Sequence, residues 1–367
     1  MKSFDAIVVG GGMLGAAVSY GLARARLRTA LVDEGDVAFR AARGNFGLVW
    51  VQSKGDGCPE YAAWTRRSAD DWAEFARELK DRTGVDVGHS RKGGFDLSFT
   101  EEDLRQREGL MTRLHDQAGG AFRFEMLDHR QLSELLPGLG PGVVGGSFCP
   151  LDGHANSLYL LRALHTAFQG LGGAYFPGSA VTRLAAKNGA FEVETGYQTL
   201  AAGRVVLAAG LANRDLAPQL GMEMPVHPLR GQIMVTERVR PFLDHPTAHV
   251  RQTVEGGLLL GDSKEDVGFD DGTTAPVMKE IARRATRAFP FLKSARIVRA
   301  WGALRVMTPD GFPVYARSAA YPGAFAIACH SGVTLAAAHA GPMADCIVGG
   351  RLPDDVAVLG PERFHAA

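Results

Sequence analysis

The residues best suited to chemistry lie near the start of the chain, in a segment rich in glycine. An apolar run, Ala6-Ile7-Val8-Val9, enters Gly10-Gly11-Gly12-Met13-Leu14-Gly15. A helix-like stretch follows to Arg26, and a second apolar run ends on Asp33. The order strand, glycine-rich turn, helix, strand and acidic residue is typical of a segment that binds a dinucleotide.

Each part of this segment has a physical role in such a site. Gly10 permits the tight turn out of the strand, Gly12 lets the backbone approach a pyrophosphate, and Gly15 lets the helix pack closely. The helix N-terminus supplies N–H groups and the positive end of the helix dipole. Asp33 stands where a carboxylate accepts hydrogen bonds from ribose hydroxyls. We predict a dinucleotide cofactor; the alternative is a glycine-rich turn in a βαβ unit that binds no nucleotide.

Length and composition fit an enzyme of two joined lobes. The 367 residues exceed one ordinary domain, and 46% of them are hydrophobic, which is enough for a large core. The 40 basic and 40 acidic residues balance, and the sequence has no block of like charges. This balance argues against nucleic acid and anionic membrane surfaces as partners.

The cysteines and the apolar segments favour a reducing compartment. The four cysteines, Cys58, Cys149, Cys329 and Cys346, are far apart and form no C-x-x-C pair, which argues against a zinc site or a disulfide framework. The glycine triplet near the N-terminus argues for a core strand and helix rather than a signal peptide. No uninterrupted apolar span is long enough to cross a bilayer. We expect a cytoplasmic protein.

Beyond Asp33 the chain does not continue as a regular alternation of strands and helices. Residues 41–57 have the mixed glycine and polar composition of a loop that presents backbone to a ligand. Periodicity predicts helices over 61–79, 101–114, 128–135, 154–171 and 276–289, and a small-residue helix that starts near 330 and ends at 348. It predicts strands that include 94–99, 174–176, 191–195, 204–210, 226–236, 257–261 and 324–328.

This order of elements interleaves two domains in an α/β (α+β) fold. We assign residues 1–84, 146–221 and 297–367 to a Rossmann-like cofactor-binding domain. Residues 85–145 and 222–296 are assigned to a substrate-binding domain. A cofactor domain in three separate pieces is not the contiguous layout of a nicotinamide dehydrogenase.

Further motifs follow the glycine segment in a fixed order along nearly the whole chain. They are Arg43-Gly44-Asn45, Asp152-Gly153-His154, Val205 to Gly210, Pro228-Leu229-Arg230-Gly231-Gln232, Leu258 to Gly261 followed by Val267-Gly268-Phe269-Asp270, Trp301 to Arg305 with Thr308-Pro309-Asp310-Gly311, and Cys329-His330-Ser331-Gly332. The ordered set resembles the D-amino acid oxidase superfamily of flavoproteins. The resemblance is strongest to glycine oxidase, sarcosine oxidase beta-type subunits and bacterial opine or amino-acid dehydrogenase subunits, and it implies FAD rather than NAD.

The resemblance also implies where the cofactor lies. A large mixed β-sheet of the substrate-binding domain would roof the flavin ring, with the substrate between ring and sheet. The implied FAD-binding residues are Gly10, Gly12, Met13, Leu14, Gly15, Asp33, Glu34, Arg43, Gly44, Asn45, Phe46, Gly47, Val181, Ala209, Gly210, His330, Ser331, Gly332, Val333 and Thr334. The start of the last helix would direct N–H groups toward the pyrimidine end of the flavin, where negative charge develops on reduction.

The attachment of the flavin is also implied. Monomeric sarcosine oxidases tether their flavin through a cysteine near the position of Ala303, and no cysteine stands there. We therefore expect non-covalent FAD.

Arg305 is the first candidate catalytic residue. It stands in Trp-Gly-Ala-Leu-Arg, where the related glycine oxidase pattern places the arginine that binds the substrate carboxylate. A guanidinium binds a carboxylate in a bidentate manner and stays charged at any working pH. The alternative is a structural arginine paired with Asp310.

The resemblance adds three candidate catalytic residues, His249, Lys264 and His330. His249 and Lys264 flank the strand expected to face the ring, where they would contact the substrate; the alternative is exposure at a strand end. His330 replaces a residue that is commonly arginine in glycine oxidase, and its alternative is a structural role. Arg230 is expected to be architectural, by satisfying buried carbonyls. The roles of His227, Gln52, Ser53 and Lys54 cannot be separated from the sequence.

The implied reaction is the oxidation of an amino acid or N-substituted amino acid at its C–N bond. Hydride transfer from the carbon next to the amine to flavin, followed by hydrolysis, would give a keto acid and an amine. The protein would contribute orientation, exclusion of water and charge complementarity. Two alternatives are an FAD-dependent 2-hydroxy acid dehydrogenase and an electron-relay flavin subunit of a multi-subunit dehydrogenase.

Leu259 bears on the electron acceptor. Monomeric sarcosine oxidases carry a lysine at this point of the strand that faces the ring, and its charge assists electron transfer to oxygen. An aliphatic side chain cannot do so, which favours a dehydrogenase that passes electrons to a quinone or partner flavoprotein over an oxidase that uses oxygen. The alternative is that nearby Lys264 or His330 supplies the charge. The sequence leaves open the exact substrate and its chirality, the physiological acceptor, and whether the chain forms a hetero- or homo-oligomer.

Overall fold

Six strands form the central sheet of the computed structural model, which describes residues 2–35, 41–187 and 189–365. Their order is β18-β19-β13-β2-β3-β9. The parallel strands are β2 (Ala6–Val9), β3 (Thr29–Val32), β9 (Ala174–Phe176), β13 (Val205–Leu207) and β19 (Ala324–Ala328), and β18 (Val314–Arg317) is antiparallel at one edge. Strands from three distant parts of the chain therefore build one sheet.

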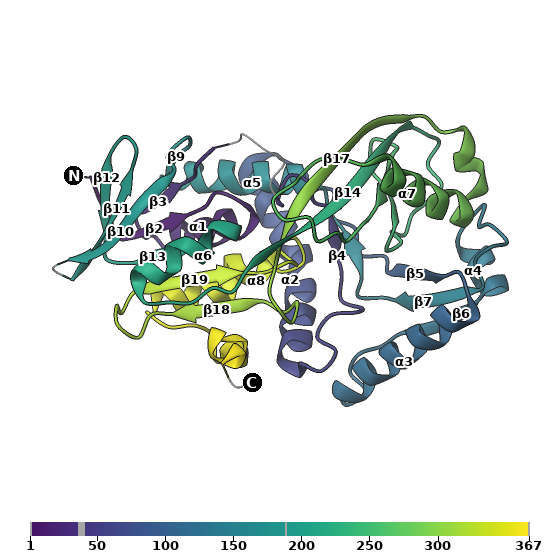
Figure 1. Cartoon of the computed structure of the whole chain (residues 1–367), viewed down its shortest axis with the longest axis horizontal. Coiled ribbons are helices and arrows are strands. Elements are labelled where there is room, and N and C mark those ends of the chain that lie inside the picture. The colour runs from purple at the N-terminus through teal and green to yellow at the C-terminus, as the bar shows by residue number, and fades with distance from the viewer. Residues whose placement is uncertain (1, 36–40, 188, 366–367) are drawn as a thin grey trace.

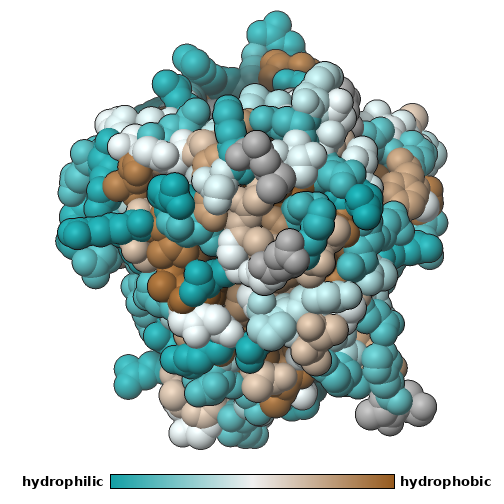
Figure 2. Space-filling view, turned by 90° about the vertical axis from the view of Figure 1, so that its left-hand side faces the viewer, coloured by the Kyte–Doolittle hydropathy of each residue, from teal (hydrophilic) through white to brown (hydrophobic). Residues whose placement is uncertain are grey.

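The central sheet is covered on both faces. Alternate residues of β2 divide between two cores: Ala6 and Val8 face the helices, whereas Ile7 and Val9 face a second sheet. The helices are α1 (Met13–Arg24), α2 (Pro59–Thr83) and α5 (Ser157–Gly170). The second sheet has the order β1-β12-β11-β10, with β1 (Lys2–Phe4), β12 (Thr199–Ala202), β11 (Ala190–Thr195) and β10 (Val181–Lys187). Seen from this end of the molecule, the surface is mainly hydrophilic with small apolar groups (Figure 2).

A second half of the molecule carries the long strands β14 (His227–Arg238) and β17 (Ile297–Met307) (Figure 1). They belong to an antiparallel sheet of order β15-β16-β14-β17, with β15 (Val250–Gln252) and β16 (Gly257–Gly261). A three-stranded antiparallel sheet contains β5 (Gly94–Ser98), β7 (Gly145–Cys149) and β6 (Glu125–Asp128). An isolated parallel β-bridge pairs Phe95 of β5 with Thr247, which precedes β15. The two sheets therefore meet here, and the joined surface contains both parallel and antiparallel pairing.

Three helices pack beside these sheets, and their ends follow from local chemistry. They are α3 (Glu101–Gln117), α4 (His129–Leu135) and α7 (Ala275–Ala288). Thr100 caps α3 by accepting from Asp103 N at 3.1 Å, and Asp128 and Gln131 form a capping box at the start of α4. A short ladder of β4 (Leu48–Val49) and β8 (Gly153–His154) links the loop before α2 to the strand before α5.

The last helix differs from its prediction. It is divided into α8 (Ala336–Ala338), a π-helical stretch over His339–Met343, and α9 (Ala344–Val348). Pro342 interrupts it because proline lacks an N–H, and Gly341 has a non-helical φ of −100° and ψ of −107°. Residues 332–335 form turns, so regular helix begins six residues after His330 rather than at it. Residues 330–334 therefore lack the dipole of a helix N-terminus, and only their own backbone N–H groups could face a bound flavin.

The remaining short elements complete the described chain. They are α6 (Asn213–Leu216) and the 3-10 helices η1 (Gly210–Ala212), η2 (Ala217–Leu220), η3 (Pro290–Ser294), η5 (Asp354–Leu359) and η6 (Pro361–Phe364). The expected domain boundary at residue 297 falls at the start of β17, whose hydrogen-bonded partner is β14 of the expected substrate-binding domain. Within the residues that the structure describes, no helix is long and apolar enough to cross a membrane.

Candidate cofactor and substrate site

A cavity of about 1130 Å³ opens at the carboxyl ends of the parallel strands. Segments from all three pieces of the expected cofactor domain line it, which is where open parallel sheets bind ligands. The expected FAD-binding residues that line the cavity are Gly10, Gly12, Met13, Leu14, Asp33, Glu34, Arg43, Asn45, Val181, Ala209, Gly210, His330, Gly332 and Val333.

The glycine turn between β2 and α1 leaves room for a phosphate. Gly10 has a φ of +102°, and a Cβ there would lie 2.5 Å from Ala208 O. A Cβ on Gly15 would lie 1.8 Å from Gly10 O, so the helix can pack here only on glycine. At Gly12 the nearest atom to such a Cβ is 3.9 Å away, and the residue lines the cavity. The turn therefore fits the pyrophosphate of a dinucleotide.

Asp33 is held in place at the end of β3. Its Oδ2 accepts from Gly11 N at 2.6 Å, and its Oδ1 accepts from Gly35 N at 2.9 Å. A carboxylate has about four lone-pair positions, so capacity for ribose hydroxyls remains. His165 on α5 also lines the cavity and its Nε2 lies 2.8 Å from Gly11 O. Sequence reasoning missed His165, because helical periodicity does not identify which helix residue meets the glycine turn.

Six expected cofactor residues do not line this cavity: Gly15, Gly44, Phe46, Gly47, Ser331 and Thr334. Several of them hold the surrounding loops. Ser331 Oγ lies 2.8 Å from the hydroxyl of Tyr61, and Thr334 Oγ1 accepts from Trp50 N at 3.0 Å. A Cβ on Gly44 would lie 2.3 Å from the Cβ of Ala303, so the loop passes directly against β17.

The loop that carries Phe46 is fastened by a residue that the sequence did not reveal. Arg251 on β15 is buried, and its Nε donates to Phe46 O at 2.8 Å. Burial lowers the pKa of Arg251 to about 10. The sheet of the second half thus contacts the loop of the cofactor side.

Arg305 lies on β17 between Leu304 and Val306, two residues that line the cavity. Its side chain is 14% exposed and forms a salt bridge with Asp262 Oδ2 at 2.5 Å. It also donates to Ser263 O at 2.6 Å. The alternative in which Arg305 pairs with Asp310 is wrong, because Asp310 pairs with Arg363 at 2.7 Å.

His249 and Lys264 lie on either side of Asp262. The Nδ1 of His249 is 3.8 Å from Asp262 Oδ1, and burial together with the charge of Arg284 lowers the pKa of this imidazole. Lys264 is exposed on the segment that follows β16. Asp262 was not among the expected site residues, and no motif marks it.

His330 lies where β19 ends, at the wall of the cavity. Burial lowers the pKa of its imidazole well below the ordinary value, and the charges of Lys54, Arg305 and Lys264 lower it further. Three cations from separate segments therefore act on one point beside the cavity. A neutral His330 can accept a hydrogen bond there, and the surrounding field favours an anionic ligand.

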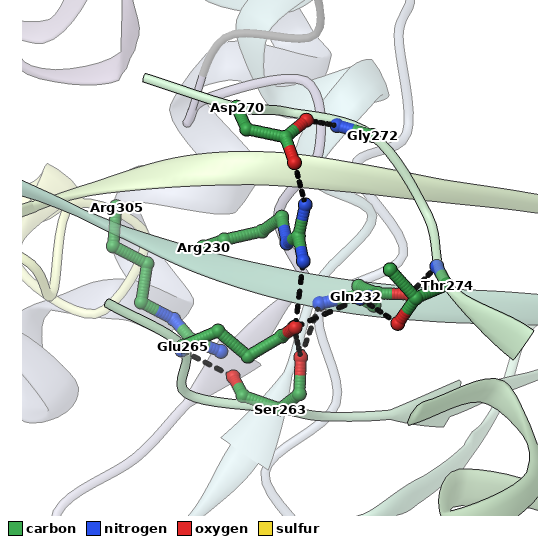
Figure 3. A network of polar contacts seen from close by, with 8 residues as sticks. All are labelled: Arg230, Gln232, Ser263, Glu265, Asp270, Gly272, Thr274 and Arg305. Atoms are coloured by element: carbon green, nitrogen blue, oxygen red, sulfur yellow. Dashed lines mark hydrogen bonds and ion pairs between the residues drawn. The ribbon is translucent and has the colours of Figure 1, made fainter. Parts of the chain in front are cut away.

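Arg230 anchors the segment that follows β16 (Figure 3). Its guanidinium pairs with Glu265 at 2.8 Å and with Asp270 at 2.5 Å, and Glu265 also accepts from Gln232 and Ser263. We expected Arg230 to satisfy buried carbonyls, but carboxylates are its partners. The role is architectural: the network holds the chain from Ser263 to Asp270, which carries Lys264 beside Arg305.

Comparison with known proteins identifies the family. The sequence profile of the family described as FAD dependent oxidoreductase (DAO) matches residues 5–346. The chain belongs to this family. The family is FAD-dependent, and the glycine turn between β2 and α1 fits a dinucleotide. FAD is therefore the dinucleotide that this DAO-family oxidoreductase uses.

Relatives and solved structures extend over the full chain. The chain is 42% identical to an opine oxidase subunit of Rhizobium meliloti and 41% identical to that of Agrobacterium tumefaciens (strain Ach5), each over 100% of this chain and 99% of the relative. The crystal structure of glycine oxidase from Geobacillus kaustophilus superposes with a TM-score of 0.91 at 25% identity, over 98% of each chain. The predicted fold class is confirmed.

Proposed function

We propose that this DAO-family enzyme oxidises the C–N bond of an amino acid or N-substituted amino acid, opines included. The observation that carries the proposal is Arg305, a mostly buried guanidinium on β17 whose strand neighbours Leu304 and Val306 line the cavity. It has five N–H donors, and its two protein partners use only part of them. The remaining donors can bind a substrate carboxylate.

The relatives support an amine rather than a 2-hydroxy acid as the substrate. Those at 41% and 42% identity are named for opine oxidation, and a relative of 27% identity from Bacillus licheniformis is named glycine oxidase. Both names describe substrates with a nitrogen next to a carboxylate-bearing carbon.

The residues of the chain would act by binding and by electrostatics. Arg305 would hold the carboxylate and so orient the neighbouring carbon. The charges of Arg305, Lys54 and Lys264 disfavour an ammonium, so the substrate amine would lose its proton to solvent before reaction. FAD, when bound, would accept the hydride, which carries both electrons of the oxidation. Loss of that hydride from carbon and of a proton from nitrogen gives an imine, which water converts to a keto acid and an amine.

Anaerobic bleaching of the bound flavin tests the proposal without assuming an electron acceptor. A panel of amino acids, N-alkyl amino acids, opines and 2-hydroxy acids is mixed with the flavin-loaded enzyme. We expect bleaching by members of the first three groups and release of ammonia or a primary amine. Bleaching by 2-hydroxy acids alone would overturn the proposal.

We further propose that the enzyme passes its electrons to a quinone or a partner flavoprotein, and that it works with a partner polypeptide. The two relatives at 41% and 42% identity are each named as one subunit of an opine oxidase, which supports a multi-subunit assembly. Leu259 is an almost fully buried aliphatic residue on β16, which cannot stabilise a nascent superoxide. Size-exclusion chromatography of the chain purified from its native host tests the assembly: co-purification of a second polypeptide is expected, and purification alone with full turnover would contradict it.

A further inference from the structure

The reaction described above uses only the charge of Lys54 and assigns its ammonium no ligand. Its side chain is half-buried and has no hydrogen bond or salt bridge within residues 2–35, 41–187 and 189–365. The charges of Lys264 and Arg305 act on its ammonium, and its own charge acts on Cys329 and His330. Trp50, on the same loop, donates its N–H to Thr334 Oγ1 at 3.0 Å, so this loop packs against the segment that follows His330.

The backbone that carries Lys54 is held unusually firmly. Ser53 has a φ of +73°, a conformation that residues other than glycine rarely adopt. Asp152 accepts from the N–H groups of Val51 and Gln52, and Lys54 N donates to Val51 O at 3.1 Å. The turn thus presents Lys54 from a fixed position rather than from a freely moving loop.

Arg107 on α3 adds a second clamp to the same turn. Its guanidinium donates to the side chains of Gln52, Ser53 and Ser147, and it pairs with Asp96 at 3.0 Å. These contacts cross from the second half of the molecule to the loop before α2. The unusual backbone conformation of Ser53 and the hydrogen bonds of Arg107 therefore fix the position of Lys54, whose ammonium has no partner in the described chain.

The nearby carboxylates do not neutralise Lys54. Asp262 is paired with Arg305, and Asp96 with Arg107. Asp152 is fully buried, and burial raises the pKa of its carboxyl to about 7. Burial and the neighbouring cations lower the pKa of Lys54 to about 8. An ammonium under this repulsion gains more from a bound anion than a solvated lysine does.

We propose that Lys54 binds a second carboxylate of the substrate, so that the enzyme takes secondary amines with a carboxylate-bearing carbon on each side of the nitrogen. This inference rests on the proposed function, because Arg305 holds the first carboxylate. The two cations come from separate segments, β17 and the loop before α2, and the amine with its reacting carbon would lie between the two bound carboxylates. Oxidation of one C–N bond followed by addition of water gives a 2-keto acid and a primary amino acid, each of which retains one carboxylate.

Two ligands that cannot be oxidised separate this role from turnover. Diglycolate carries a carboxylate on each side of an ether oxygen, and diglycolamate, its monoamide, has nearly the same shape with one charge. Their dissociation constants are measured on the flavin-loaded enzyme from the change in flavin absorbance. The variants are Lys54→Met, which keeps the apolar stem, Lys54→Arg, which keeps the charge, and Lys92→Met as the matched control. Lys92 is an exposed lysine paired with Asp244 at 3.5 Å.

We expect the wild-type chain and Lys92→Met to bind diglycolate at least about tenfold more tightly than diglycolamate. In Lys54→Met this preference should fall to about unity while diglycolamate affinity stays within about threefold, and Lys54→Arg should restore most of it. An equal loss of affinity for both ligands, or an unchanged preference, would overturn the assignment of Lys54. Failure of every amine to bleach the flavin would instead contradict the proposed reaction, and the ligand preference would still report on Lys54.

Discussion

Replacing Arg305 by methionine should weaken the binding of carboxylate ligands by two separate effects. The first is loss of a charge-assisted contact, about 1.5–3 kcal/mol, or about tenfold to about 150-fold in affinity. The second is exposure of Asp262, whose salt bridge with Arg305 at 2.5 Å is lost. If the unpaired Asp262 carboxylate lay about 6 Å from the ligand carboxylate, it would repel the ligand by about 1.4 kcal/mol at an effective dielectric constant of about 40, about another tenfold.

The double variant Arg305→Met/Asp262→Asn separates these effects. It lacks both charges, so it should bind diglycolamate about tenfold more tightly than Arg305→Met, although still more weakly than the wild-type chain. The assay is titration of the flavin absorbance. Arg363→Met is the matched control, since Arg363 and Asp310 are 18% and 30% exposed, against 14% and 31% for Arg305 and Asp262.

Arg363→Met should lower the free energy of unfolding by about as much as Arg305→Met does, and it should leave the affinity for diglycolamate unchanged. If Arg305→Met bound diglycolamate as tightly as the wild-type chain, Arg305 would be a structural residue that holds Asp262. If the double variant gained nothing, the Asp262 carboxylate would not face the ligand. Either result refutes the reasoning above.

Four further predictions concern the cofactor, the charge of Lys54 and oxygen. Acid precipitation should release FAD into the supernatant; flavin retained on the denatured chain would contradict non-covalent attachment, and FMN would contradict the cofactor. Gly12→Val should lose bound FAD while the circular dichroism of the apo chain is unchanged, because its side chain would occupy open cavity space; full flavin content would refute this role. The preference for diglycolate should decline as pH rises through about 8, since the lowered pKa of Lys54 means that its cation is present below that pH and lost above it. Lys54→Arg, which stays charged beside Lys264, Arg305, Asp152 and Cys329, should keep the preference to higher pH, and parallel pH curves for the two chains would contradict the assignment. In stopped-flow mixing with air-saturated buffer, the substrate-reduced enzyme should reoxidise more slowly than it turns over with artificial acceptors; faster reoxidation would make it an oxidase.

The cofactor segment could be predicted from the sequence because its contacts are local. Gly15 packs against Gly10, and Gly11 N donates to Asp33, all within one strand, helix and strand. The buried strands and the amphipathic helices α2 and α7 were likewise predicted, since their side-chain periodicity is a property of consecutive residues. The last helix was not, because Pro342 and Gly341 interrupt a run of small residues that otherwise looks helical.

The sequence by itself thus determined the family, the FAD cradle and Arg305 as a candidate catalytic residue, but β17, the strand that carries Arg305, was not among the predicted strands. Only the tertiary structure decided which charges are already paired. Arg305 pairs with Asp262 and not Asp310, Arg230 pairs with Glu265 and Asp270, and Lys54 has no counter-ion among the described residues. The physical reason is that these neighbours are set by strand register and by the packing of loops from different domains. Which charged groups pair depends on their distance in space, and the number of residues between them in the sequence does not determine that distance.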